Sequence, residues 1–353
     1  MKKKVTVLSI ILGIVIVIAT VLGIYHKATY MVINNLFAYK IDMDESDEWD
    51  NGTSYVKVQY ALDSDSQYLD LYVPDSGTEV KPKLFVLVHG GGFIYGDSQT
   101  RQAQLMYRYF RDNGYACATI NYRLAQEEMF PAAISDVKAA VRYLRSHADD
   151  YGYDSENIAI WGESAGGYLA IATAVTNDDE FMDVEYVDQE KIEADGDKVS
   201  AKVSICVDYY GAVELGFTKK SDWKTENVPM IVVTIANLWL NTDIIKGYPD
   251  VESYWLREDT TNMTEEELAY SNLYTYIEEN LRKDTDLKFY ISHGDSDITV
   301  PLLQSERFYN TLIDIMGEER VLFKVVKSAG HAGDIMYTDE ELSQIKEYLD
   351  SNL

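Results

Sequence analysis

Short apolar runs alternate with longer amphipathic segments through most of the chain. Residues 55–60 and 67–73 alternate apolar and polar side chains with a period of two, as antiparallel edge strands do. Residues 84–88 are instead continuously apolar, which is typical of a central strand buried on both faces. Five further strands are predicted at 116–121, 157–161, 203–208, 287–291 and 321–326. Helical segments separate most of these strands, so the pattern predicts a mostly parallel sheet of about eight strands with helices on both faces.

Two helices are marked by their ends. Pro131 is suited to the first turn of a long helix at about 131–147. Thr338 and Glu341 have the spacing of a capping box, which predicts that the closing helix begins there.

The alternation of strands and helices breaks between about 214 and 272. Within this segment residues 228–240 are apolar and bulky but too few to cross a membrane, and Thr264 with Glu267 gives another capping box. We expect a helical cap inserted after the strand that ends at Asp208, lying over the functional site. The alternative is a surface decoration that has no connection with a ligand.

The N-terminal segment predicts a membrane anchor. Three lysines precede an uncharged, largely apolar run at 5–25, which as a helix would be about 31 Å long, close to the thickness of a hydrocarbon core. Acidic residues follow, so the positive-inside rule places the N-terminus in the cytoplasm and the remainder outside. A cleaved secretory signal is the alternative, although no Ala-x-Ala-like site stands out. The third alternative is that residues 5–25 form a buried helix of the globular domain. The expected division is a signal-anchor at 1–27, a juxtamembrane linker at 28–54 and one domain at 55–353.

Composition excludes several classes of partner. The formal net charge of −28 over 353 residues argues against binding to nucleic acid or to an anionic membrane surface, because both need clustered Lys and Arg. Two cysteines imply neither a disulfide framework nor a thiolate metal site. No cluster has the spacing of metal ligands and no Gly-rich loop has a phosphate-binding context, so we expect no metal and no cofactor. The oligomeric state stays open.

Gly162-x-Ser164-x-Gly166 lies between a predicted strand and a helix rich in small residues. A serine on such a sharp turn is held in a strained backbone conformation with its hydroxyl raised above the sheet edge, and the two glycines let the strand and helix pass without a Cβ clash. The turn also leaves the N–H of Ala165 at a helix N-terminus, where the dipole favours a developing oxyanion. The pattern predicts an activated serine nucleophile.

Further motifs follow other predicted strands. They are His89-Gly90-Gly91-Gly92-Phe93, Asn121-Tyr122-Arg123-Leu124, His293-Gly294-Asp295-Ser296-Asp297 with Val300-Pro301, and Gly330-His331. With these motifs the chain, from about residue 55 to its C-terminus, resembles the α/β-hydrolase family. Within that family it is similar to carboxylesterases and lipases related to hormone-sensitive lipase and to bacterial acetylxylan and feruloyl esterases. The resemblance implies the α/β-hydrolase fold with a helical cap.

The resemblance also implies a triad, with Ser164 as nucleophile, Asp297 as acid and His331 as general base. A serine hydroxyl needs an imidazole to take its proton, and the imidazole needs a carboxylate to fix its tautomer. Asp295 is the alternative acid, since it shares the loop of Asp297. The N–H groups of two loop glycines and of the residue after the nucleophile should form the oxyanion hole, namely Gly91, Gly92 and Ala165.

Of the five histidines, only His331 lies in a loop directly after a late strand. His26 and His147 are expected at the surface, and His89 and His293 are expected to hold loop conformations.

The remaining polar residues of these motifs are assigned structural roles or none. Tyr122 and Arg123 are expected to stabilise the fold behind the site. Glu163 orients a neighbouring loop or is merely solvated, with no catalytic part. Asp208 is either structural or pocket-lining.

The two cysteines, Cys117 and Cys206, fall in strands that the family's strand order places three positions apart. That separation is about 14 Å, too far for a disulfide.

The expected function is hydrolysis of small or carbohydrate-linked esters by a serine esterase anchored to the cell membrane, with its catalytic domain outside the cytoplasm. Removal of acetyl or feruloyl groups from plant polysaccharide competes with a generalist short-chain esterase activity. A peptidase of the same fold, a catalytically silent hydrolase-fold module that binds a ligand, and a surface interaction protein are the alternatives.

Overall fold

A computed structural model describes residues 49–75, 77, 79–193, 198–215, 248, 251–260, 263–264, 266–281 and 286–353. The predicted anchor, most of the predicted linker and the apolar segment 228–240 lie outside the described residues. Within the described part of the chain, no helix is both long enough and apolar enough to cross a membrane.

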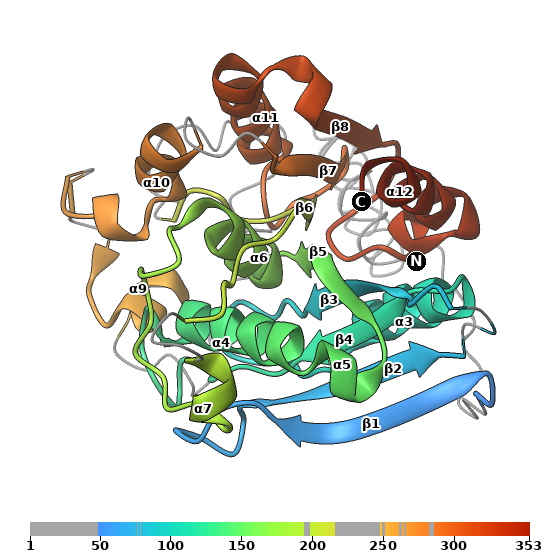
Figure 1. Ribbon diagram of the computed structural model, residues 1–353. Helices are drawn as coiled ribbons and strands as arrows, with labels where there is room; N and C mark the ends of the chain where they lie inside the picture. Colours follow the sequence, from blue (N-terminus) through green and yellow to red (C-terminus); the bar gives the residue numbers. More distant parts are fainter. Residues whose placement is uncertain are drawn as a thin grey trace, which may run out of the picture.

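The predicted sheet is present as a single eight-stranded sheet (Figure 1). Its strands are β1 (Gly52–Gln59), β2 (Tyr68–Pro74), β3 (Lys83–Val88), β4 (Ala116–Ile120), β5 (Asp154–Glu163), β6 (Ile205–Tyr209), β7 (Lys288–Gly294) and β8 (Val321–Val326). Their order across the sheet is β1-β2-β4-β3-β5-β6-β7-β8. Strands β1 and β2 pair in antiparallel fashion, as do β2 and β4, and the remaining pairs are parallel. The carboxyl ends of β3 and β5 to β8 therefore meet at one edge.

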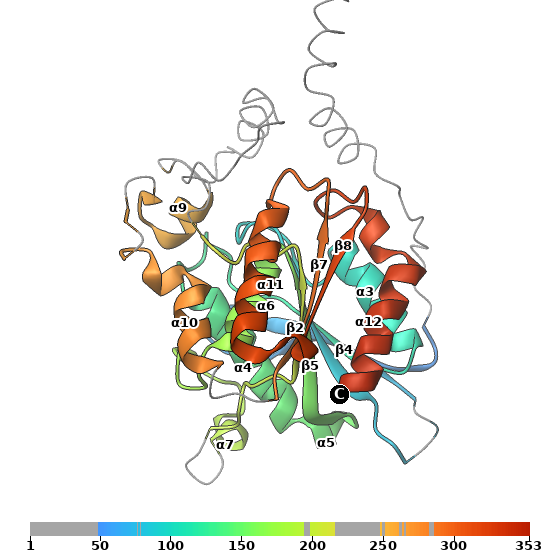
Figure 2. The same cartoon turned by 90° about the horizontal axis from the view of Figure 1, so that it is seen from above.

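Helices cover both faces of the sheet, as the alternation predicts. The α-helices are α3 (Arg101–Asp112), α4 (Ala132–Ser146), α5 (Ala148–Tyr151), α6 (Ala165–Val175), α7 (Gln189–Ile192), α9 (Val251–Leu256), α10 (Leu273–Asn280), α11 (Leu302–Met316) and α12 (Asp339–Asn352). Three 3₁₀ helices, η5 (Ala269–Ser271), η6 (Glu318–Arg320) and η7 (Asp334–Tyr337), complete the described elements. Figure 2 shows α3 and α12 on one face of the sheet and α4, α6 and α11 on the other.

The core consists of two apolar layers, one on each face of the sheet. Val86 of β3 belongs to the layer under α4, α6 and α11, whereas Phe85 belongs to the layer under α3 and α12. Because successive side chains of a strand point to opposite faces, a strand covered on both sides needs apolar residues at every position. This burial on both faces explains the continuous apolar run at 84–88.

The predicted start is confirmed for α12 and is shifted by one residue for α4. The Thr338 hydroxyl accepts a hydrogen bond from the Glu341 N–H at 3.4 Å, so α12 begins at the predicted cap. Helix α4 begins one residue later than expected, with Pro131 at its N-cap.

The capping box of Thr264 and Glu267 forms, because each backbone N–H donates to the other residue's side chain. The described residues that follow it form turns, the 3₁₀ helix η5 and then α10. Most of the predicted cap insertion at 214–272 lies outside the described residues, so its overall form stays a prediction.

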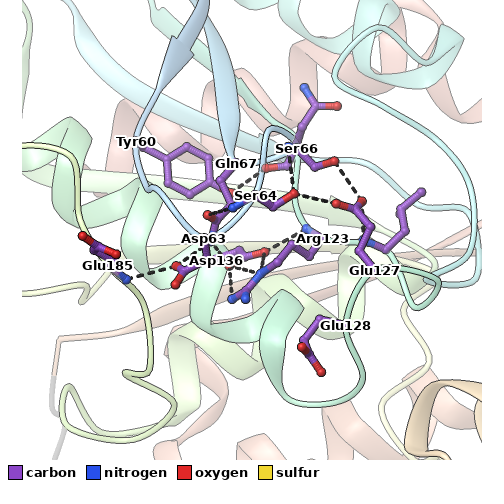
Figure 3. A network of polar contacts seen from close by, with 12 residues as sticks. Tyr60, Asp63, Ser64, Ser66, Gln67, Arg123, Glu127, Glu128, Asp136 and Glu185 are labelled. Carbon is purple, nitrogen blue, oxygen red and sulfur yellow. Dashed lines mark hydrogen bonds and ion pairs between the residues drawn. The ribbon is translucent and has the colours of Figure 1, made fainter.

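Arg123 joins the loop after β4 to α4, in agreement with its predicted role behind the site (Figure 3). Its guanidinium donates to the Asp136 carboxylate at 2.7 Å, and its backbone N–H donates to the same group at 2.8 Å. The Gln67 amide donates to that carboxylate at 2.7 Å from the β1–β2 turn. Asp136 is fully buried, so these donors replace the water that its charge would otherwise require.

Both cysteines are free and buried, in β4 and β6. These strands lie three positions apart in the sheet, as the family's strand order implies.

Candidate active site

The predicted turn around Ser164 is present between β5 and α6. Ser164 has φ 52° and ψ −120°, a conformation that costs energy for a residue with a side chain. A Cβ on Gly162 would lie 2.0 Å from the Gly166 carbonyl oxygen, and a Cβ on Gly166 would lie 2.2 Å from the Val88 carbonyl oxygen. Glycine is therefore required at both positions by close backbone packing, as the sequence predicts.

The three residues of the predicted triad lie in hydrogen-bond contact. The Nε2 atom of His331 is 3.0 Å from the Ser164 Oγ, and its Nδ1 atom is 2.7 Å from the Asp297 Oδ2. Ser164 follows β5, Asp297 follows β7 and His331 follows β8, so the three side chains meet where parallel strands end at the same sheet edge.

Asp297 is the carboxylate that contacts His331, and the alternative acid has other partners. The Asp295 Oδ1 accepts from the Ser328 N–H at 2.7 Å and from the Ser296 hydroxyl at 3.1 Å. Asp295 thus holds the turn after β7 to the segment before His331. The structure brings together the predicted Ser164, Asp297 and His331 and leaves Asp295 outside the hydrogen-bonded chain.

The electrostatics of the acid and base reinforce each other. Burial by itself raises the pKa of Asp297, but His331 and His293 together with their hydrogen bonds hold it well below its usual range. The Asp297 Oδ1 also accepts the N–H groups of Thr299 at 2.7 Å and Val300 at 3.0 Å. Burial lowers the pKa of His331, but Asp297 outweighs this effect and raises the pKa overall. Asp297 thus stays ionised and favours the imidazolium that forms when His331 takes a proton.

The glycine loop after β3 lies directly against Ser164. A Cβ on Gly90 would come within 3.2 Å of the Ser164 Cβ, and Gly91 and Gly92 have φ values of 113° and 59°. Those φ values lie in the left-handed region that favours glycine. Ala165 begins α6 beside this loop, at the helix N-terminus. The loop and the helix end have the arrangement expected of an oxyanion hole; the donor roles of Gly91, Gly92 and Ala165 stay predictions.

Helix α9 packs on the glycine loop from the side of the predicted cap. The ring of Trp255 stacks on Phe93 with centroids 3.8 Å apart and planes within 5°. The Phe130 N–H donates to the Trp255 carbonyl at 3.1 Å. This packing fixes the outer end of the loop and brings part of the predicted cap segment next to the site.

Glu163 is buried, so the alternative that it is merely solvated is wrong. Its Oε2 accepts the hydroxyls of Tyr210 at 2.5 Å and Tyr337 at 3.1 Å. The Gly90 N–H approaches its Oε1 at 3.5 Å, which supports the alternative role of orienting a neighbouring loop. Burial raises the pKa of Glu163, against the lowering effect of the Tyr210 hydrogen bond.

The two tyrosines that hold Glu163 were missed by sequence reasoning. They lie far away in the chain, and nothing distinguishes them among 28 tyrosines except that Tyr210 comes two residues after the central strand predicted at 203–208.

Three other polar residues take structural positions. His293 is buried and contacts the Ser305 hydroxyl at 2.7 Å and the Val300 carbonyl at 2.9 Å, so it holds the loop of Asp297, as expected. Asp208 is fully buried against Gly167, which favours the structural alternative for it, and burial raises its pKa to about 7. His147 is buried next to Asp188 instead of exposed as expected, because its ring packs on Tyr143.

The arrangement can perform acyl transfer. It combines a serine on a strained turn, an imidazole within hydrogen-bond distance of that serine, and a carboxylate that orients the imidazole. Among the described residues, no group of three or more His, Cys, Asp or Glu side chains is arranged to hold a metal ion.

Comparison with known proteins agrees with this geometry. The chain matches the BD-FAE family over residues 69–312, a range that contains Ser164 and Asp297. It is 26% identical over 291 residues to the probable carboxylic ester hydrolase LipM of Mycobacterium tuberculosis. The aligned region covers 78% of this chain and 57% of that relative. The chain thus spans little more than half the length of that relative.

Solved structures share the fold. A bifunctional GH43-CE protein of Bacteroides eggerthii superposes with a TM-score of 0.66 at 25% identity, covering 87% of this chain and 36% of that protein. A truncated carbohydrate esterase from gut microbiota superposes with a TM-score of 0.64 at 24% identity, covering 86% of this chain and 97% of that one. Since the family match extends over well more than half of the residues, the chain belongs to the BD-FAE family of α/β-hydrolase esterases.

Proposed function

We propose that this protein hydrolyses carboxylic esters through an acyl-enzyme formed on Ser164. The observation that carries the proposal is the continuous chain of hydrogen bonds from the Ser164 hydroxyl through His331 to Asp297. His331 lies beyond the range matched by the family, so its place in this chain of contacts rests on the tertiary structure.

In the first half of the reaction, the Ser164 Oγ attacks the ester carbonyl carbon and its proton passes to the His331 Nε2. Asp297 stabilises the resulting imidazolium through Nδ1, and the N–H groups of Gly91, Gly92 and Ala165 receive the negative charge on the former carbonyl oxygen. The tetrahedral intermediate collapses as His331 gives its proton to the leaving alcohol oxygen. Ser164 then carries the acyl group.

In the second half, water takes the place of the alcohol. His331, neutral again, removes a proton from the water as it attacks the acyl carbon. The second intermediate breaks its bond to the Ser164 Oγ, which regains the proton from His331, and the carboxylic acid leaves. The reaction thus consumes one ester and one water and returns Ser164 and His331 to their starting forms.

For the substrate we propose a carbohydrate-linked acetyl or feruloyl ester, or another short-chain ester. Membership of the BD-FAE family supports the carbohydrate-linked class, and so do two structural relatives described as GH43-CE and carbohydrate esterase. We also propose that residues 5–25 hold the catalytic domain outside the cytoplasm, on the sequence pattern alone.

The test compares the full-length chain in detergent with its Ser164→Ala variant. The substrates are p-nitrophenyl esters of increasing acyl length, an acetylated oligosaccharide and a feruloylated oligosaccharide. We expect kcat to fall by about 10⁴-fold or more in the variant, because nucleophile and base act as one unit. Ser343→Ala, on the exposed side of α12, is the matched control and should retain wild-type turnover.

A folded wild-type protein that is inactive on every ester would contradict the proposal and favour a silent binding module. If turnover is present, the preferred ester decides between a carbohydrate esterase and a generalist esterase.

A further inference from the structure

The Glu163 carboxylate lies next to the nucleophile in sequence and has no part in the reaction steps above. It is a meeting point of three segments that surround Ser164. Gly90 belongs to the glycine loop, Tyr210 directly follows β6, and Tyr337 ends η7, shortly after His331. Each segment donates a hydrogen bond to this one buried carboxylate, so both of its oxygens have a donor.

Tyr210 connects the carboxylate to the general base. Its ring lies against the imidazole of His331, with centroids 4.8 Å apart and planes tilted by 60°. Its hydroxyl lies 2.5 Å from both the Glu163 Oε2 and the Tyr337 hydroxyl. Tyr337 lies in η7, and this helix is held by an ion pair. The guanidinium of Arg101 pairs with Asp334, the first residue of η7, at 2.7 Å. Tyr210 thus lies between the His331 ring, which it contacts, and the Glu163 carboxylate, to which it donates.

The charge balance of the site changes during the reaction in a way that favours this carboxylate. In the resting site two buried carboxylates, Asp297 and Glu163, lie near the imidazole of His331, and the imidazole of His293 also contacts Asp297. When His331 takes the Ser164 proton, the imidazolium is attracted by both of them, and the attraction is stronger than in water because both carboxylates are buried. Asp297 makes a hydrogen bond to the ring, whereas Glu163 acts across space and through the position of Tyr210.

Both carboxylates also raise the pKa of His331. Asp297 raises its pKa most, through its charge and its hydrogen bond, and the charge of Glu163 raises it further, against the lowering effect of burial. Asp297 and Ser164 contact His331 along the hydrogen-bonded chain, and Tyr210 lies against its ring with Glu163 behind Tyr210. The imidazole of His293 lies on the same Asp297 oxygen.

We propose that Glu163 is a positioning residue for ester hydrolysis, which stabilises the protonated form of His331 and ties the glycine loop to the Tyr210–Tyr337 pair. This inference rests on the proposed function, because it concerns the same base. The sequence alone had indicated no catalytic part for Glu163.

The experiment measures kcat/KM for p-nitrophenyl acetate across pH in the full-length wild type and in Glu163→Gln. The amide keeps the size of the side chain and can still accept the Tyr210 hydrogen bond, but it has no charge. Loss of that charge makes the imidazolium less stable, so the pKa of His331 falls. We expect the acid limb of the profile to move down by about half a unit or more, and the plateau to drop by about tenfold. A merely structural role would lower the plateau and leave the acid limb in place.

Glu127→Gln is the matched control. The Glu127 carboxylate also accepts two hydroxyls, those of Ser64 at 2.6 Å and Ser66 at 2.8 Å, but on the exposed side of the molecule (Figure 3). Its profile should superpose on that of the wild type.

Three outcomes decide between the two proposals. An inactive wild type would remove the proposed function and this inference with it. An active wild type with an unmoved acid limb in Glu163→Gln would overturn the inference alone. If Glu163→Gln does not fold, Glu163→Asp carries the test, since it keeps the charge. Its acid limb should stay within about 0.2 unit of wild type, and a downward shift of half a unit would overturn the inference.

Discussion

The imidazole of His293 lies on the same carboxylate oxygen as the imidazole of His331. The His293 Nε2 is 3.3 Å from the Asp297 Oδ2, and the His331 Nδ1 is 2.7 Å from that oxygen. The two histidines approach it from β7 and from the loop after β8. His293 also contacts the Ser305 hydroxyl of α11, so the acid is held by its own strand and by a helix that packs on it. The orientation of the acid therefore depends on a residue that does not touch the nucleophile.

Replacement of His293 by alanine is expected to lower kcat/KM by about tenfold, far less than loss of the nucleophile. The Asp297 carboxylate would keep its contacts with His331 and with the N–H groups of Thr299 and Val300, but it would lose one of its donors and its support from α11. Steady-state kinetics on a p-nitrophenyl ester would show the effect. His147→Ala is the control, because that imidazole pairs with Asp188 instead. A loss as large as that of Ser164→Ala would mean that His293 takes a direct part in the reaction.

The two candidate acids can be separated by matched amide variants. Asp297→Asn leaves the shape of the site but offers His331 an amide, which permits the wrong tautomer, so kcat should fall by about 10⁴-fold. Asp295→Asn weakens the hydrogen bond from the Ser328 N–H and should cost less than about tenfold. The measurement is kcat for both variants on one ester, beside the melting temperature. The assignment of Asp297 would be overturned by the reverse order of losses.

Asp208 is expected to limit stability at neutral and alkaline pH. Burial raises its pKa from 3.8 to about 7, so the folded protein binds a proton that the unfolded chain has already released above pH 4. The sign follows from this difference: the contribution of Asp208 is most favourable below pH 4 and is lost progressively as pH rises toward 7. Asp208→Asn removes that dependence while its side-chain oxygen can still accept the Gly211 N–H.

We therefore expect Asp208→Asn to raise the melting temperature at pH 8 relative to wild type and to change it less at pH 4. Thermal unfolding followed by circular dichroism at both pH values checks this. A variant that is destabilised equally at the two pH values would show that the carboxylate is ionised in the folded state and needed there.

The Arg123–Asp136 pair should be costly to break and of little consequence for the chemistry. Arg123→Met leaves the fully buried Asp136 carboxylate without its guanidinium partner, which costs about 3–5 kcal/mol in the free energy of unfolding. Urea unfolding measures the loss. The control is Lys81→Met, which breaks the exposed pair with Asp149 and should cost less than about 1 kcal/mol. If Arg123→Met unfolds at the same urea concentration as Lys81→Met, the buried network of Figure 3 does not stabilise the fold.

Local pattern was sufficient for most of the sheet. Each predicted strand is present, because a strand covered on both faces needs apolar residues on both, a pattern visible in a short window of sequence. The sharp turn that carries the candidate nucleophile was predicted for a similar reason. The turn at Ser164 requires glycine two residues before and two residues after the serine, so a short stretch of sequence reveals it. The prediction of an edge strand at 67–73 was wrong, since β2 lies between β1 and β4 and is buried along most of its length.

The environment of Glu163 had no comparable signal. Its burial depends on Tyr210 and Tyr337, which are distant in the chain and meet it only because β6 lies beside β5 and η7 folds over the same edge. The same holds for His147, whose position at a helix end suggested exposure, while packing on Tyr143 and contact with Asp188 bury it.

The amino-acid sequence by itself determined which segments form strands and where the sharp turn at Ser164 lies. Through resemblance, it predicted the triad of Ser164, Asp297 and His331. Tertiary structure showed that Asp297, the acid that the resemblance favours, contacts His331. It alone decided that His293 shares this carboxylate and that Glu163 is enclosed by two tyrosines. The physical reason is the range of the interactions involved. Propensity and backbone sterics act between neighbours in the chain, whereas burial and hydrogen bonding of a charged group depend on whichever segments the parallel sheet brings to its carboxyl edge.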